Sequence, residues 1–118
     1  MTVLIVDDDE AIASMLSRFL SREGFQVHTA LDALQALDFL EREKISLVIT
    51  DLMMPHMDGR ALVRQIRKDP RHKDIPVILI TAFPSDEAAD KSLRDGASFF
   101  LPKPLDLDAL ATLIRFAE

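Results

Sequence analysis

The chain has 118 residues, enough for one compact domain, and its 48% hydrophobic content can supply a buried core. It contains no cysteine, which excludes disulfides and thiol chemistry, and its net charge of −6 argues against direct binding to nucleic acid. No stretch approaches the ~20 apolar residues of a membrane span and no basic leader precedes the first apolar run, so we expect one cytoplasmic domain over residues 1–118, without a membrane partner.

Apolar runs typical of buried strands alternate with stripes typical of amphipathic helices. Residues 3–6 form the first run, and the stripe after it has the spacing of a helix that buries one face and ends at Gly24. The stripe consists of Ile12, Met15, Leu16, Phe19 and Leu20. Residues 25–30 form a shorter, more polar run, which predicts an edge strand. Asp32 is suited to cap the next helix. The apolar residues of that helix are Leu34, Leu37 and Leu40.

The third run, residues 46–50, ends before Asp51 and leads into a loop that contains Pro55 and Gly59. Asp58 is suited to cap the helix after this loop, because its side chain can accept from the free peptide N–H groups of the first turn. The predicted core face of this helix consists of Leu62, Val63 and Ile66.

The fourth run, residues 77–80, ends at Thr81. The helix that follows begins at Ser85, stops at Gly96 and is the least hydrophobic of the set. The residues that it offers to a core are Ala88, Ala89 and Leu93. We therefore expect this helix to have the weakest packing in the molecule.

The fifth run, residues 99–101, precedes Lys103 and a last helix capped by Asp106. The apolar residues of that helix are Leu107, Leu110 and Ile114. Strands that alternate with helices imply right-handed crossovers and a mainly parallel sheet with helices on both faces. We therefore predict an α/β fold: a single-domain (βα)5 doubly wound parallel sheet. By analogy with flavodoxin-like domains, we assign it the strand order 2-1-3-4-5.

The carboxyl ends of neighbouring parallel strands lie along one edge of the sheet, where open α/β sheets place their ligands. This edge would bring together Asp7, Asp8, Asp51, Thr81 and Lys103. Three carboxylates at one point repel one another, so a cation must enter or some pKa values must rise. A site of oxygen ligands suits Mg²⁺ better than zinc, and a carboxylate can act as the nucleophile that forms an aspartyl phosphate.

The residues after these runs form four motifs whose order and spacing are specific. They are Val6-Asp7-Asp8-Asp9, Asp51-Leu52-Met53-Met54-Pro55-x-Met57-Asp58-Gly59, Thr81-Ala82 and Lys103-Pro104. With them the chain resembles the receiver domain of two-component response regulators over nearly all of its length. The resemblance implies that Asp51 accepts a phosphoryl group from a phosphohistidine on a sensor histidine kinase or phosphotransfer protein. It also implies that Asp7, Asp8, Asp51 and the backbone carbonyl of Met53 hold Mg²⁺.

The resemblance implies further roles around the phosphoryl group. Thr81 would donate its hydroxyl to a phosphoryl oxygen, and Lys103, aimed by a cis bond to Pro104, would neutralise charge. Ala82 and Met53 would be neighbours of the phosphoryl group, and the small side chain of Ala82 would leave room for it. Thr81 would also act as a switch together with Phe100. The position of Phe83 is one where the family tunes dephosphorylation, and a bulky apolar group there would slow the approach of water.

The same resemblance predicts how the signal leaves the domain. Phosphorylation would change the face formed by the fourth helix, the fifth strand and the fifth helix, which would bind a downstream protein or output domain. Ser98 and Phe99 stand where relatives that dimerise through this face carry acids, which argues against that dimer and leaves a homodimer open. The domain would assist its own phosphorylation and dephosphorylation without being an enzyme.

Two other functions fit parts of the pattern. A haloacid-dehalogenase-like phosphatase would use Asp7 as nucleophile and Asp9 as acid, followed by Thr81 and Lys103 in the right order. It leaves Asp51 unexplained, however, and we favour Asp9 as a helix cap. The second alternative is a receiver-like interaction module that binds partners without phosphorylation, which the intact acidic set disfavours.

Overall fold

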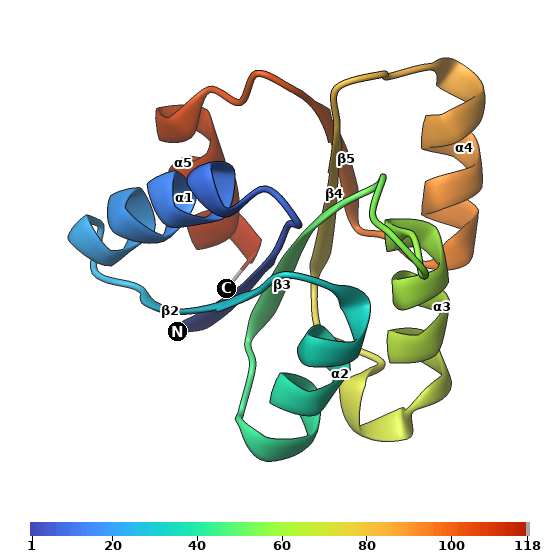
Figure 1. Ribbon diagram of the computed structural model, residues 1–118, viewed down its shortest axis with the longest axis horizontal. Helices are drawn as coiled ribbons and strands as arrows, with labels where there is room; N and C mark the ends of the chain where they lie inside the picture. Colours follow the sequence, from blue (N-terminus) through green and yellow to red (C-terminus); the bar gives the residue numbers. More distant parts are fainter. Residues whose placement is uncertain (118) are drawn as a thin grey trace.

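The five apolar runs form one parallel sheet in a computed structural model that describes residues 1–117 (Figure 1). The strands are β1 (Thr2–Val6), β2 (Gln26–Ala30), β3 (Leu47–Asp51), β4 (Val77–Thr81) and β5 (Phe99–Pro102). Their order is β2-β1-β3-β4-β5, which confirms the predicted topology. Each crossover carries a helix, as parallel neighbours require.

Within the described residues 1–117, five α-helices cover the two faces of this sheet. They are α1 (Glu10–Arg22), α2 (Ala33–Arg42), α3 (Gly59–Lys68), α4 (Asp86–Asp95) and α5 (Leu107–Ala117), and a short 3₁₀ helix, η1 (Pro70–His72), follows α3. In Figure 1, α1 and α5 lie on one side of the sheet, whereas α2, α3 and α4 lie on the other. The domain therefore has three layers, with the sheet in the middle.

Polar side chains fix where the helices begin. The N-cap side chain accepts hydrogen bonds from free peptide N–H groups of the first turn. Replacing such a side chain with alanine typically lowers stability by about 1 kcal/mol. The capping residues with such bonds are Asp9, Asp32, Asp58, Ser85 and Asp106. These are the positions that the sequence predicts, so the bounds of the helices follow from local chemistry.

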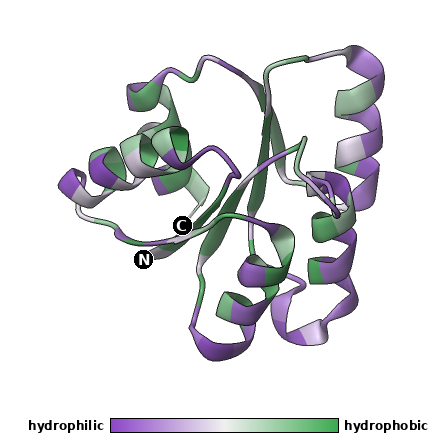
Figure 2. Cartoon of the chain, viewed as in Figure 1, coloured by the Kyte–Doolittle hydropathy of each residue, from purple (hydrophilic) through white to green (hydrophobic). Residues whose placement is uncertain are grey.

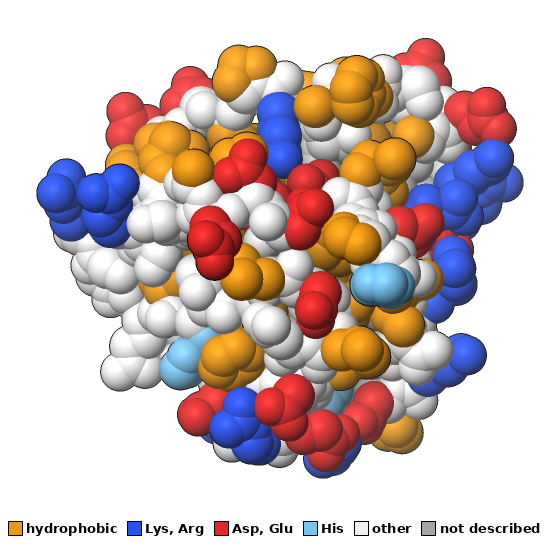
Figure 3. Space-filling view, viewed as in Figure 1, with side chains coloured by type: hydrophobic (Ala, Val, Ile, Leu, Met, Phe, Trp, Pro, Cys, Tyr) orange, Lys and Arg blue, Asp and Glu red, His pale blue; other side chains and the backbone are white. Residues whose placement is uncertain are grey.

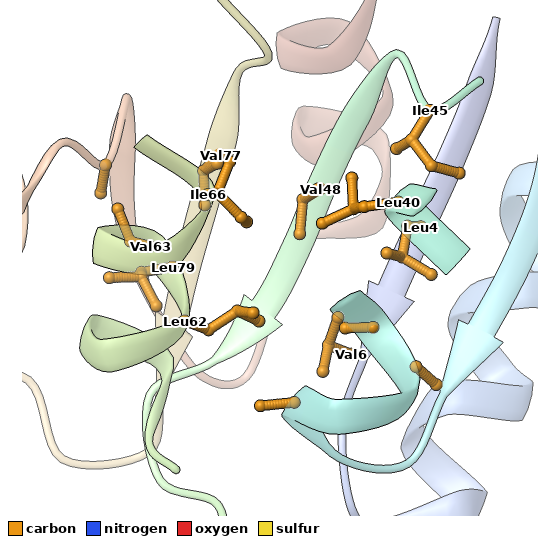
Figure 4. Packing of buried hydrophobic residues seen from close by; sticks show 14 of the residues in the cluster. Leu4, Val6, Leu40, Ile45, Val48, Leu62, Val63, Ile66, Val77 and Leu79 are labelled. Atoms are coloured by element: carbon orange, nitrogen blue, oxygen red, sulfur yellow. The ribbon is translucent and has the colours of Figure 1, made fainter. Parts of the chain in front are cut away.

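Alternating residues of the strands supply a core on each face of the sheet. Val3 and Ile5 of β1 pack with α1 and α5, whereas Leu4 and Val6 pack with α2 and α3. Figure 4 shows the second cluster, in which Leu62 and Ile66 of α3 lie against the strands. Figure 2 shows the resulting pattern, with hydrophobic strands in the centre and hydrophilic residues on the outer sides of the helices.

Two predicted core faces are partly wrong. In α2, Leu34 is 68% exposed, whereas Leu40 is buried as predicted and the small residues Ala33 and Ala36 complete the buried face. In α4, Leu93 is 47% exposed and the one buried residue is Ser92. The prediction that α4 packs weakly is confirmed, because Ser92 is its one buried residue and the predicted core residue Ala88 packs against the core only as a partly buried side chain.

Within residues 1–117, no helix combines the length and the apolar character that crossing a bilayer would require.

Candidate functional site

The acidic residues meet at the carboxyl edge of the sheet, as the topology predicts. Asp7 directly follows β1, and Asp51 is the last residue of the neighbouring strand β3. Together with the exposed Asp8, each offers a carboxylate oxygen, and these oxygens lie within 4.8 Å of one another. Figure 3 shows acidic side chains gathered among hydrophobic ones on this side of the molecule.

Asp7 is fully buried and is held from two sides. Its peptide N–H donates to the carbonyl of Ala30 at the end of β2 (3.0 Å). One carboxylate oxygen, Oδ1, accepts from the peptide N–H of Asp9 (2.9 Å), while Oδ2 accepts from Nζ of Lys103 (3.4 Å). The two oxygens of Asp7 therefore have separate partners, and only Oδ2 points toward the lysine.

Asp51 is 7% exposed and shares the same lysine. Its Oδ2 accepts from Nζ of Lys103 (3.1 Å), and its Oδ1 accepts from the peptide N–H of Met53 (3.3 Å). The peptide bond between Lys103 and Pro104 is cis, as expected. The two contacts of Nζ place the ammonium of Lys103, in the loop after β5, between the two buried carboxylates.

The charges at this site do not balance. Burial raises the pKa of Asp7 above its ordinary value, and the charge of Asp51 adds to this, while the peptide N–H of Asp9 and the ammonium of Lys103 oppose it. Burial alone would lower the pKa of Lys103, but hydrogen bonds and charge from Asp51 and Asp7 outweigh burial and raise it. One ammonium faces the three carboxylates, so the site favours an additional cation.

The donor set fits Mg²⁺ on chemical grounds. It consists of carboxylate oxygens from Asp7, Asp8 and Asp51, and an exposed Asp8 leaves one side open to water. Mg²⁺ is usually bound by a few carboxylates and keeps several waters, whereas zinc prefers nitrogen and sulfur ligands. An acidic cluster that can hold a divalent cation is therefore part of this site.

Thr81 ends β4 next to Asp51 on the sheet edge and is fully buried. Its Oγ1 accepts from the peptide N–H of Phe83 (3.1 Å), which ties the hydroxyl to the loop that leads to α4. Ala82 is exposed and lines, with Lys103, an apolar cavity of about 480 Å³. Phe83 itself is 78% exposed.

The other predicted switch residue, Phe100, lies on β5, two strands from Asp51. It is half-buried and packs against the core cluster on the side of α2, α3 and α4. Phe99 and Leu101, its neighbours, are half-buried on the opposite face. Phe100 therefore lies on the same side of the sheet as α4, but outside the acidic cluster.

Sequence reasoning assigned no role to two backbone contacts of the site. Gly59, the first residue of α3, is buried, and a Cβ atom there would clash with the carbonyl oxygen of Asp51 and lie 3.0 Å from Cα of Leu52. The sequence motif contains this glycine, but the spacing of the motif does not indicate that Gly59 lies against the backbone of Asp51 and Leu52. The peptide N–H of Asp9, which donates to Asp7, was missed for the same reason.

Polar contacts hold the end of α4 that is far from Thr81. Nε of Arg60 and Nη1 of Arg64, both on α3, lie 2.6 and 3.2 Å from Oδ2 of Asp95 at the last residue of α4. Nε of Arg67 donates to the carbonyl of Gly96 (3.0 Å). Burial raises the pKa of Asp95, but hydrogen bonds and charge from the two arginines outweigh burial and lower it. The C-terminal end of α4 is thus tied to α3.

Comparisons with known proteins agree on one family. The family profile described as the response regulator receiver domain matches residues 3–115. The response regulator PleD of Caulobacter vibrioides is 40% identical over 113 residues, and the response regulator MprA of Mycobacterium avium is 36% identical over 115 residues. These matches cover 96% and 98% of this chain. They span only 25% of PleD and 50% of MprA.

The structure has close counterparts among solved structures. The chemotaxis protein CheY4 of Vibrio cholerae superimposes with a TM-score of 0.94 at 30% sequence identity, and the match covers 99% of this chain and 98% of that one. Fold and sequence thus point the same way.

Proposed function

The chain belongs to the response regulator receiver domains of two-component signalling, whose general function is phosphorylation on an aspartate, and from this we propose that the aspartate used here is Asp51. The observation that carries the proposal is the position of its carboxylate. Asp51 ends a central strand, is nearly buried, and its Oδ2 lies 3.1 Å from the ammonium of Lys103. A carboxylate in this place can meet an incoming phosphoryl group with a cation already beside it.

In the proposed reaction, a carboxylate oxygen of Asp51 attacks the phosphorus of a phosphohistidine. The new P–O bond forms as the P–N bond breaks, and the electron pair of that bond stays on the imidazole nitrogen. Lys103 stabilises the negative charge of the phosphoryl oxygens, since its Nζ is already held between Asp51 and Asp7. Little covalent help is needed, because positioning and charge neutralisation dominate phosphoryl transfer.

The cation that this chemistry uses is proposed to be Mg²⁺. Asp7, Asp8, Asp51 and the backbone carbonyl of Met53 would hold it, and when bound it would neutralise charge on the phosphoryl oxygens. The chain's own contribution is to keep Asp7 and Asp51 close together in a buried site despite their repulsion.

Thr81 and Phe100 are proposed to report the phosphorylated state. The Thr81 hydroxyl can donate to a phosphoryl oxygen, and if it turns to do so its Oγ1 leaves the peptide N–H of Phe83. That bond is a link from the site to the start of α4, whose far end is tied to α3 through Asp95. Phe100 would adjust its packing with α4, changing the face formed by α4, β5 and α5 for a downstream protein or output domain.

The neighbours of the phosphoryl group are proposed to set its lifetime. Ala82 adds little bulk, which leaves room for the group, whereas Met53 and Phe83 are 62% and 78% exposed beside the site. Exposed apolar side chains here can obstruct the approach of the hydrolytic water. The proposed role is therefore that of a phosphoacceptor that assists its own phosphorylation and dephosphorylation, partnered by a histidine kinase or phosphotransfer protein.

The phosphatase alternative is not favoured. It requires Asp9 as an acid at the reacting atoms, but Oδ1 of Asp9 accepts from the peptide N–H groups of Ala11 and Ile12 and caps α1. The proposed role as phosphoacceptor also gives Asp51 a function, whereas the phosphatase leaves this residue without one.

The experiment that tests the proposal is intact-mass measurement after incubation with acetyl phosphate. Wild-type protein should gain one phosphoryl group when Mg²⁺ is present and none when a chelator is added. Asp51→Asn should gain none in either condition while its melting curve shows that it is folded. An adduct that persists in Asp51→Asn would move the phosphoacceptor role to another carboxylate, with Asp7 as the first candidate.

A further inference from the structure

Asp9 contacts the site and α1 at the same time, through different atoms. Its carboxylate oxygen Oδ1 accepts from the peptide N–H groups of Ala11 (2.9 Å) and Ile12 (3.3 Å), and its carbonyl accepts the first helical bond from Ala13. Its peptide N–H, in contrast, donates to Oδ1 of Asp7 (2.9 Å). The residue therefore joins the start of α1 to the buried carboxylate.

The side chain of Asp9 does not belong to the acidic cluster, although it follows two acids that do. The oxygens within 4.8 Å of one another come from Asp7, Asp8 and Asp51. The backbone of Asp9 is extended, with φ −87° and ψ 104°, the usual conformation of an N-cap residue. In this conformation its carboxylate faces α1 while its peptide N–H faces Asp7.

The two oxygens of Asp7 are divided by this arrangement. Oδ1 is occupied by the peptide N–H of Asp9, and Oδ2 lies 3.4 Å from Nζ of Lys103. A carboxylate held at one oxygen cannot rotate freely, so the other oxygen keeps its direction. Outer contacts that orient a ligand in this way commonly affect metal affinity by about tenfold or more.

We propose that Asp9 is a positioning residue for the proposed metal ligand Asp7. Its carboxylate caps α1, and the cap keeps its peptide N–H on Oδ1 of Asp7, so that the Asp7 carboxylate, which would hold the cation, stays oriented with Oδ2 toward Lys103. The inference rests on the proposed function, because it assumes that Asp7 binds Mg²⁺. It assigns no role to the negative charge of Asp9. Any side chain with an oxygen that reaches the first turn of α1 should therefore substitute for it.

The test compares four variants at this position. Asp9→Asn and Asp9→Ser keep an acceptor for the cap and remove the charge, whereas Asp9→Ala and Asp9→Gly remove the acceptor. Glycine is included because it is tolerated at the N-cap although it has no side-chain oxygen. The Asp9→Gly variant should therefore stay folded and keep the test valid even if Asp9→Ala unfolds. Asp32→Ala is the matched control, since Oδ1 of Asp32 caps α2 through Gln35 (2.8 Å) without contacting the acids.

Mg²⁺ affinity and the backbone amide of residue 9 are both read from ¹H–¹⁵N NMR spectra during a Mg²⁺ titration. Asp9→Asn, Asp9→Ser and Asp32→Ala should bind Mg²⁺ within about twofold of wild type, and Asp9→Ala and Asp9→Gly about tenfold more weakly. In the metal-free state, the amide of residue 9 should lose its protection from hydrogen exchange only in the variants without an acceptor.

Three results would contradict the inference about Asp9 or the metal site on which it rests. Wild-type affinity and an unchanged residue 9 amide in Asp9→Ala and Asp9→Gly would overturn the inference, because Asp9 would then be a helix cap alone. An equal loss in Asp9→Asn and Asp9→Ser would also overturn it, since the charge would be what matters. Wild-type protein that does not bind Mg²⁺ would refute the proposed metal site, and the inference about the metal would fall with it.

Discussion

Nζ of Lys103 lies 3.1 Å from Oδ2 of Asp51, across 52 positions of the sequence. The same Nζ is 3.4 Å from Oδ2 of Asp7, so one ammonium bridges carboxylates at the ends of two adjacent strands. It does not neutralise the three carboxylates of the cluster. The ammonium of Lys103 is therefore one fixed cation of the site, and the remaining negative charge favours the binding of a second cation.

Replacing Lys103 with Met should slow phosphorylation of Asp51. Methionine keeps an unbranched side chain but removes the ammonium that is nearest to the phosphoryl oxygens. Because the negative charge that develops on these oxygens is then less stabilised, the rate of phosphorylation should fall about tenfold or more. The rate is measured by intact mass over time with acetyl phosphate and saturating Mg²⁺. Lys73→Met, an exposed lysine of the loop after η1, is the matched control and should react as wild type does. Equal rates for both variants would contradict the role of Lys103.

Replacing Asp7 with Asn should stabilise the metal-free protein at neutral pH. The folded state raises the pKa of Asp7 above its ordinary value of 3.8, mainly through burial, so ionised Asp7 opposes folding. Asn removes that cost and should raise the free energy of unfolding by about 0.5–2 kcal/mol. Chemical denaturation in the presence of a chelator measures the change. Asp8→Asn changes the charge equally at an exposed position and should give a smaller gain.

The pH dependence of the Asp7→Asn effect has a definite sign. Because the pKa of Asp7 is raised in the folded state, this residue's contribution to stability is fully present below pH 3.8 and is lost as pH rises through the raised pKa. The gain from Asn should therefore be largest at neutral pH and disappear below pH 3.8. A gain that grows as the pH falls would contradict this account of burial and repulsion.

Replacing Phe83 with Ala should shorten the lifetime of the phosphoryl group severalfold. The aromatic ring is 78% exposed two residues after Thr81, where it can obstruct water, and its removal opens the site. The lifetime is followed by intact mass after acetyl phosphate is removed. Phe116→Ala removes an equally exposed ring from α5 and should leave the lifetime unchanged. A longer lifetime in Phe83→Ala would show that the ring assists hydrolysis.

Replacing Gly59 with Ala should disturb the site as well as the fold. The new Cβ would clash with the carbonyl oxygen of Asp51, so β3 or α3 must shift, at a cost of about 1–3 kcal/mol or more. Gly24→Ala is the control: φ there is +94° and the space is open, so strain should cost about 1–2 kcal/mol far from the site. Phosphorylation should slow in Gly59→Ala alone. Similar rates in the two folded variants would mean that Gly59 has only a structural role.

The sequence predicts much of this molecule because its signals are local. Apolar runs specify the strands. Each of the five capping residues directly precedes its helix in the sequence and is of a type that favours the N-cap position. The site follows from the topology, since parallel strands bring Asp7 and Asp51 to one edge. The identity of the phosphoacceptor remains a prediction that rests on the motif and on its geometry.

The errors arise where packing decides between faces of a helix. Leu34 looks like a core residue by hydropathy, but the face of α2 that packs against the core carries Ala33 and Ala36 instead. Ser92 looks like a surface residue, yet it is fully buried and its hydroxyl lacks a hydrogen-bond partner among the described residues. Tertiary contacts of this kind cannot be predicted from the periodicity of the sequence. The same holds for the salt bridges from Arg60 and Arg64 to Asp95.

The most direct test of the account is to locate the phosphoryl group. After phosphorylation with acetyl phosphate and Mg²⁺, reduction with borohydride converts an aspartyl phosphate into homoserine, and tandem mass spectrometry of the digested protein identifies the residue. We predict conversion at Asp51 alone, dependent on Mg²⁺. Conversion at Asp7 or Asp8, with Asp51 unchanged, would contradict the account and assign the chemistry to a different carboxylate of the same site.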